Sequence, residues 1–124
     1  MNSLAVLVGA FLWAVATLAV YFGGARLFLT GGVGLVVLFA ATVPAAWAIL
    51  AGFWRLARTP RTDRLGVAAL IVTPALLLDT MLFLGRTAVL PGFTPGAADR
   101  FAAWVMWAAA ATLVIAIRGS RPRP

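Results

Sequence analysis

Four long apolar runs, separated by short polar or glycine-rich segments, dominate the hydropathy pattern of the chain. They cover residues 4–22, 33–53, 65–84 and 101–117. A run of about 20 apolar residues is the length that an α-helix needs to cross the hydrocarbon layer of a bilayer. The pattern therefore predicts an all-α fold, an integral membrane four-helix bundle, with residues 1–124 as a single four-span domain.

The first apolar run ends in Gly23-Gly24 and has two interpretations. The small-x-small stretch at residues 14–16 is of the kind that signal peptidase cleaves, which is typical of a signal peptide. However, no basic residue precedes the run, and its apolar stretch is longer than a usual signal core. The pattern therefore favours a first membrane span.

Residues 27–54 form an apolar stretch that, as one helix, would be longer than a bilayer core. We expect Gly31, Gly32 and Gly34 to loosen its first turns. Residues 33–53 then form the second span, and residues 27–30 form either an interfacial lead-in to it or a tilted extension of it.

The segment between the third and fourth runs, residues 85–100, is rich in Gly and Pro and is typical of a loop with turns. Near its end, Asp99 is expected to be the N-cap of the fourth helix, where a carboxylate also complements the helix dipole. This places the start of the fourth helix at about Phe101.

The net charge of +7 comes from ten arginines and three aspartates, with no Lys, Glu or His. These charges lie at the ends and turns of the apolar runs and not on a soluble face, so we interpret them as a topology signal and expect no nucleic-acid partner. Arginine without lysine, together with abundant Ala and Gly, also favours a GC-rich bacterial source.

The arginines are distributed unequally over the two sides of the predicted bundle. Three belong to the side on which the first span ends, Arg26, Arg86 and Arg100. The other side has seven, namely Arg55, Arg58, Arg61, Arg64, Arg118, Arg121 and Arg123. By the positive-inside rule, the seven are topology determinants that face the cytoplasm. We expect a multi-pass protein of the bacterial cytoplasmic (inner) membrane with both termini cytoplasmic.

The sequence lacks the residues that several kinds of catalytic and binding sites require. Without Cys there is no thiolate nucleophile, and without His the usual ligand of haem, copper and zinc is missing. The glycine-rich stretches match no nucleotide-binding motif, and the acids and arginines form no nucleophile and base pair. We therefore expect no enzyme activity, no cofactor and no metal site.

Asp79 lies inside the third apolar run and is the first candidate for a functional residue. A carboxylate at membrane depth costs free energy, so it is usually paired or used. The predicted topology puts it on the same side as Arg26, Arg86 and Arg100. Two roles are open: an intramembrane ion pair that sets helix register, which we favour, and a transport site at which Asp79 titrates or binds an ion.

Other polar and aromatic side chains in the spans are expected to serve packing. Thr73, Thr80 and Thr87 recur every seven residues, and a membrane threonine most often bonds to the carbonyl one turn back. Trp13 and Trp47 lie deep in their runs and are expected to pack between helices.

Two known types of small four-span transporter have the length of this chain but different motifs. Small multidrug transporters carry a Glu in the first helix, whereas no acid precedes Asp63 here. Dual-topology fluoride channels have a Phe-rich polar motif in the third helix that is missing, and the arginine asymmetry favours one orientation.

The second half of the chain resembles a family of small four-span bacterial membrane proteins of unknown function. The resemblance rests on Leu78-Asp79, on Phe93, and on the stretch FAAWVMWA at residues 101–108. The stretch WAVATL at residues 13–18 is compatible with it, as is the arginine that opens the second helix. The resemblance implies the four-span topology and marks Asp79, Trp104 and Trp107 as positions of interest.

The sequence leaves two function hypotheses. The first is a non-enzymatic membrane protein that acts through helix–helix association, with the lipid bilayer and a second copy or another membrane protein as partners. Small residues on the faces of the spans favour it. The alternative is a small oligomeric transporter or channel that uses Asp79 as a titratable or ion-binding group.

Overall fold

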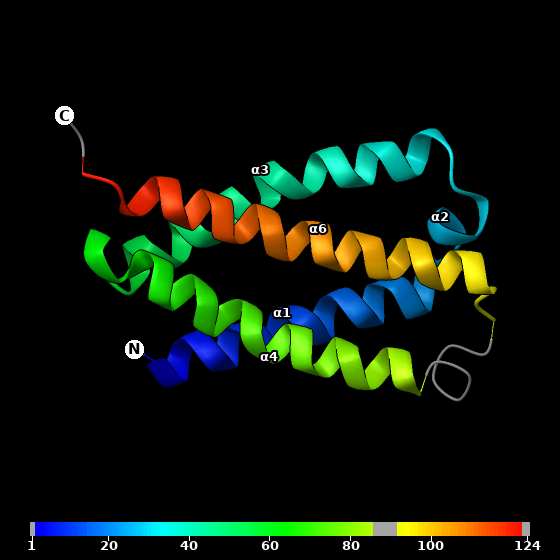
Figure 1. The fold of residues 1–124 in the computed structure, drawn as a ribbon, viewed down its shortest axis with the longest axis horizontal. Coiled ribbons are helices and arrows are strands. Elements are labelled where there is room, and N and C mark those ends of the chain that lie inside the picture. The colour runs from blue at the N-terminus through cyan, green and yellow to red at the C-terminus, as the bar shows by residue number, and fades with distance from the viewer. Residues whose placement is uncertain (1, 86–91, 123–124) are drawn as a thin grey trace.

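The computed structural model describes residues 2–85 and 92–122, and in these ranges the ordered elements are all helical (Figure 1). In chain order they are α1 (Asn2–Ala19), the π-helix η1 (Val20–Gly24), α2 (Ala25–Thr30), α3 (Val33–Leu56), the 3₁₀-helix η2 (Arg61–Asp63), α4 (Arg64–Leu84) and α6 (Pro95–Ser120). The all-α prediction is confirmed.

Four helical stretches are long and apolar enough to cross a membrane. They are Asn2–Gly23, Val33–Leu56, Arg61–Leu84 and Pro95–Ser120. Each contains one of the four runs predicted from the sequence. Their length and composition are those of a small membrane protein.

The long helices run alternately in opposite directions along the chain (Figure 1). Their contacts join them in the order α1, α4, α6, α3. α1 packs on α4, α4 on α6, and α6 on α3. Among the described residues, α1 and α3 are not a closely packed pair. The bundle is therefore open along one edge, between its first and second spans.

The break between the first two spans falls at Gly31 and Gly32, not at the earlier glycine pair. The helix continues from α1 through η1 into α2, whereas Gly31 and Gly32 have φ of 66° and 76°, which favours glycine. Residues 27–30 therefore belong to the short helix α2, which is separated from α3 and does not lead directly into it. This helix packs on α6, where the Phe28 ring is 1% exposed.

The N-cap of α6 is Thr94, so the expectation for Asp99 is wrong. The Thr94 hydroxyl accepts a hydrogen bond from the Ala97 amide at 3.2 Å, and Pro95 occupies the first turn, where its missing N–H is not needed. The helix thus begins before the predicted Phe101. Asp99 is exposed, beyond the cap.

Small residues bring α1 and α4 into close contact. Gly9 of α1 lies directly against the backbone of Ile71 in α4, and a Cβ atom at Gly9 would overlap the Ile71 carbonyl oxygen. Ala5 and Ala68, on the same two helices, are fully buried. Membrane helices associate closely where small residues allow their backbones to approach, and this contact sets the register of α1 on α4.

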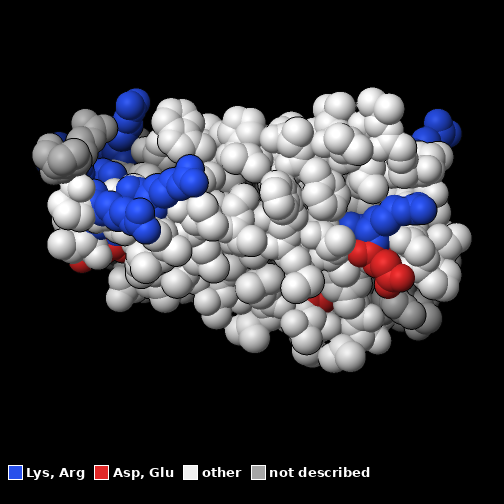
Figure 2. Space-filling model, turned by 45° about the horizontal axis from the view of Figure 1, so that its top comes forward, with Lys and Arg blue, Asp and Glu red and all other residues white. Residues whose placement is uncertain are grey.

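Apolar side chains cover the outside of the bundle. The face shown in Figure 2 has its arginines toward the two ends and a wide band without them between. Trp47 is 59% exposed on α3, so the prediction that it packs between helices of this chain is wrong. Its side chain has the exposure of a lipid-facing or partner-facing group.

Candidate functional site

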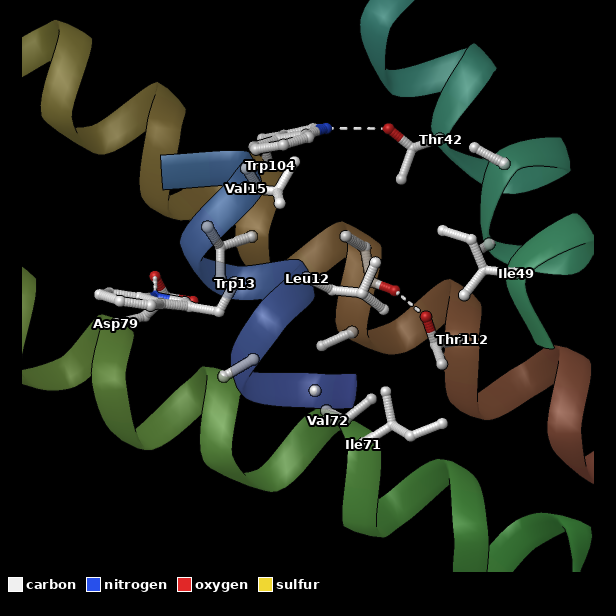
Figure 3. A pocket seen from close by; sticks show the side chains of 18 of the residues that line it. Leu12, Trp13, Val15, Thr42, Ile49, Ile71, Val72, Asp79, Trp104 and Thr112 are labelled. Atoms are coloured by element: carbon white, nitrogen blue, oxygen red, sulfur yellow. Dashed lines mark hydrogen bonds between the residues drawn. The ribbon is translucent and has the colours of Figure 1, made fainter. Parts of the chain in front are cut away.

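A crevice of about 440 Å³ lies inside the bundle, between the four long helices (Figure 3). Its walls are mostly aliphatic, with Leu12 from α1, Ile49 from α3 and Val72 from α4 among them. Because α1 and α3 both line it without packing closely on each other, the crevice opens between these two helices. A bound molecule would meet mainly hydrocarbon there.

Asp79 is the charged residue among the described residues in the wall of this crevice. It comes from α4 and is 6% exposed. Its Oδ1 accepts a hydrogen bond from the indole Nε1 of Trp13, on α1, at 2.8 Å. Oδ2 has no hydrogen-bond partner among the described residues, and this oxygen is not fully buried. The carboxylate is thus held by one neutral donor and keeps free acceptor capacity.

Sequence reasoning did not identify Trp13 as the partner of Asp79. It did predict that Trp13 packs between helices, and this is confirmed, because the ring lies against the buried cluster that includes Val20 and Leu82. A buried indole N–H usually finds a hydrogen-bond acceptor, so the position of Trp13 deep in its apolar run was the sequence signal for such a bond. Which acceptor it finds depends on the register of α1 on α4.

Neither of the two described arginines that were expected near Asp79 forms an ion pair with it. The Arg100 guanidinium donates to the backbone carbonyls of Phe28, at 2.7 Å, and Leu29, at 3.2 Å, near the end of α2. Arg26 is exposed, and neither of these two arginines forms an ion pair with Asp79. Arg86 lies outside the described residues.

A second set of tryptophan hydrogen bonds joins α6 to α3. Trp104 Nε1 donates to the Thr42 hydroxyl at 2.8 Å, and that hydroxyl donates to the Leu38 carbonyl at 2.7 Å. Trp107 Nε1 donates to the Phe39 carbonyl at 2.9 Å. The two tryptophans marked by the family resemblance therefore hold α3 on the bundle, and Trp104 also lines the crevice.

Most threonines in the spans bond within their own helix, as predicted. Thr73 donates to the Ala69 carbonyl and Thr80 to the Leu76 carbonyl, both one turn back. Thr87 lies outside the described residues. Thr112 bonds in the same way to Ala108 and lines the crevice.

The predicted topology determinants gather at the end of the bundle where both termini lie (Figure 1). The described ones end or follow α3, precede or begin α4, or end or follow α6: Arg55, Arg58, Arg61, Arg64, Arg118 and Arg121. Arg64 Nη1 donates to the Gly119 carbonyl at 3.1 Å, and its guanidinium carbon lies 4.7 Å from the centre of the Trp54 ring. Arg64 thereby ties the start of α4 to the end of α6. Arg123 lies outside the described residues.

Comparison with known proteins assigns the chain to a family. The model of a family described as "Family of unknown function (DUF5367)" matches residues 27–121, which include α3, α4, α6 and the Asp79 position. No curated protein and no solved structure matches the chain.

Proposed function

The chain belongs to DUF5367, a family of unknown function, and from its crevice we propose that it is a small non-enzymatic membrane protein that binds a solute at Asp79 and carries it across the bilayer. One observation carries the proposal: a buried carboxylate lines an intramembrane crevice with an indole, and not an arginine, as its described partner.

The nature of that partner favours transport over a structural ion pair. An arginine would compensate the charge of Asp79, whereas the Trp13 indole is neutral and supplies one hydrogen bond. A buried carboxylate without a compensating cation is costly in hydrocarbon. Such a group is retained most often in a substrate or ion pathway, and Oδ2, which has no partner among the described residues, supplies the place for a solute at the crevice.

Because four spans enclose little space, we propose that the protein works as an oligomer. We also propose that it lies in a bacterial cytoplasmic membrane. The arginine-rich end faces the cytoplasm in this proposal, because six described arginines lie there (Arg55, Arg58, Arg61, Arg64, Arg118, Arg121) against two at the other end (Arg26, Arg100). Both termini are then cytoplasmic.

A second candidate function is association with a second copy or another membrane protein. The exposed Trp47 on α3 favours it, together with the exposed small residue Ala48 next to it on the same helix. Small residues let a neighbouring helix approach closely. Replacing Trp47 with Ala would then dissociate an oligomer in nanodiscs without changing the fold of one chain.

The transport proposal is tested by flux into liposomes that contain the wild-type protein, across a panel of monovalent ions and small amines. We expect flux above that of empty liposomes, and we expect Asp79→Asn to abolish it. Asp99→Asn is the matched control, because Asp99 is exposed and outside the crevice. Wild-type flux from Asp79→Asn, or no flux of any solute from the wild type, would overturn the proposal.

A further inference from the structure

The hydrogen-bonding groups in the wall of the crevice restrict what it can bind. Beside Asp79, the polar side chains that line it in the described part of the chain are Trp13, Thr17, Thr42, Trp104 and Thr112. A ligand must complement the donors and acceptors that these groups leave free, because an unpaired polar group in hydrocarbon is costly.

Nearly all donors of the wall are already used within the protein. The two indole N–H groups donate to Asp79 and Thr42. The Thr42 and Thr112 hydroxyls donate to backbone carbonyls of their own helices. Only the Thr17 hydroxyl has no hydrogen-bond partner among the described residues. The crevice therefore has little with which to hold an anion or a carbonyl.

The carboxylate of Asp79, by contrast, keeps capacity to accept hydrogen bonds. Asp79 Oδ2 has no partner among the described residues, and a carboxylate can accept at both oxygens. No arginine is among the described residues that line the crevice. The electrostatic complement that the site lacks is thus a single positive charge with N–H or O–H donors.

The aliphatic walls decide between an inorganic and an organic cation. Hard metal ions prefer about six oxygen ligands, whereas one carboxylate and a few hydroxyls are present here. A volume of about 440 Å³ lies within the range of about 300–1,000 Å³ that is usual for sites of organic ligands. The indole rings of Trp13 and Trp104 also line the crevice, and indole is the aromatic ring that attracts cations best.

We propose that the crevice binds a lipophilic organic monocation, an amine whose N–H groups donate to Asp79 and whose compact apolar body lies against the aliphatic side chains of α1, α3 and α4. This inference rests on the proposed solute site at Asp79 and names its substrate class. The opening between α1 and α3 lets such a molecule enter sideways from the bilayer, where it concentrates.

The test uses three probes that share one apolar cage: adamantan-1-amine, adamantane-1-carboxylate and adamantan-1-ol. Binding to the full chain in nanodiscs is measured by titration calorimetry, with empty nanodiscs as the reference for partition into lipid. We expect the amine to bind about tenfold or more tightly than the alcohol, and the carboxylate not to bind. Equal binding of the three probes, or tightest binding of the carboxylate, would overturn the inference.

Two variants assign the preference to Asp79. Asp79→Asn should weaken amine binding about tenfold or more and leave alcohol binding within about twofold, because only the charge is lost. Asp99→Asn, outside the crevice, should bind all three probes as the wild type does. Unchanged amine binding in Asp79→Asn would place the cation elsewhere and overturn the inference. The ranking of probes by the wild type tests it even where Asp79→Asn fails to fold.

The inference and the proposed function fail separately. Asp79-dependent flux of a solute other than an amine, without amine binding, would overturn the substrate class and leave the transport proposal standing. Amine binding that depends on Asp79, without flux, would support the substrate class for a binding protein and overturn transport.

Discussion

The indole of Trp13 and the carboxylate of Asp79 form a hydrogen bond of 2.8 Å between α1 and α4, inside the bundle and at the wall of the crevice. The two residues are 66 positions apart in the chain. This bond is the only side-chain hydrogen bond of Asp79 within the described part of the protein. It both orients the carboxylate and leaves Oδ2 free.

Trp13→Phe keeps an aromatic ring at this position but removes the N–H donor. The carboxylate then loses its partner, and we expect the free energy of unfolding to fall by about 1–3 kcal/mol. Denaturant titration in detergent micelles measures it. Trp47→Phe is the matched control, since Trp47 is 59% exposed, and its effect should stay within about 0.5 kcal/mol. Equal effects of the two variants would contradict the assignment.

Combining Trp13→Phe with Asp79→Asn tests the coupling of the pair. Because both residues take part in one hydrogen bond, the effects of the single changes on the free energy of unfolding should not add. We expect a coupling energy of at least about 0.5 kcal/mol in a double-mutant cycle. Simple additivity would mean that the two side chains do not interact in the membrane.

Gly9→Ala tests the close contact between α1 and α4. The added Cβ would overlap the Ile71 carbonyl oxygen, so the helices must move apart, at a cost of about 1–3 kcal/mol in the free energy of unfolding. Gly66→Ala on α4 is the matched control, because a Cβ there meets no atom within 4 Å. That control should be neutral or raise stability by up to about 1 kcal/mol. A harmless Gly9→Ala would be inconsistent with the observed register.

Thr42→Val tests the bond that holds α3 to α6. The change keeps the shape of the side chain but leaves the Trp104 N–H without its acceptor, and we expect a loss of about 1–3 kcal/mol in unfolding free energy. Thr80→Val removes a hydroxyl that bonds only to its own helix, at an exposed position, and should change stability by less than about 0.5 kcal/mol. Similar losses for both would argue against a role for the Trp104 bond.

The orientation can be measured with single cysteines, because the chain has none of its own. Thr62→Cys lies in η2 at the arginine-rich end, and Gly92→Cys follows α4 at the opposite end. A membrane-impermeant thiol reagent added to intact cells should label residue 92 and not residue 62. The reverse pattern would invert the proposed topology, and cell lysis, which exposes both sites, is the control.

Much of the fold could be predicted from the pattern of residues along the chain. Apolar runs of bilayer length must become helices, because only helices satisfy every backbone group of a single span in hydrocarbon. The number of spans, the position of Asp79 on the third of them, and the gathering of Arg55 to Arg64 with Arg118 at one end follow from order and length alone. It was harder to predict which of two nearby polar side chains caps a helix. At the start of α6 the cap is the hydroxyl of Thr94 and not the expected carboxylate of Asp99.

The candidate site depended on the tertiary structure. A run of apolar residues does not specify which face of a helix meets which neighbour, since lipid and protein interior are similarly apolar. The close approach at Gly9 sets the register of α1 on α4 and brings Trp13 to Asp79. Arg100 donates instead to a backbone carbonyl near the end of α2. The sequence thus placed a costly carboxylate in the membrane, and helix packing decided that a tryptophan holds it beside a crevice.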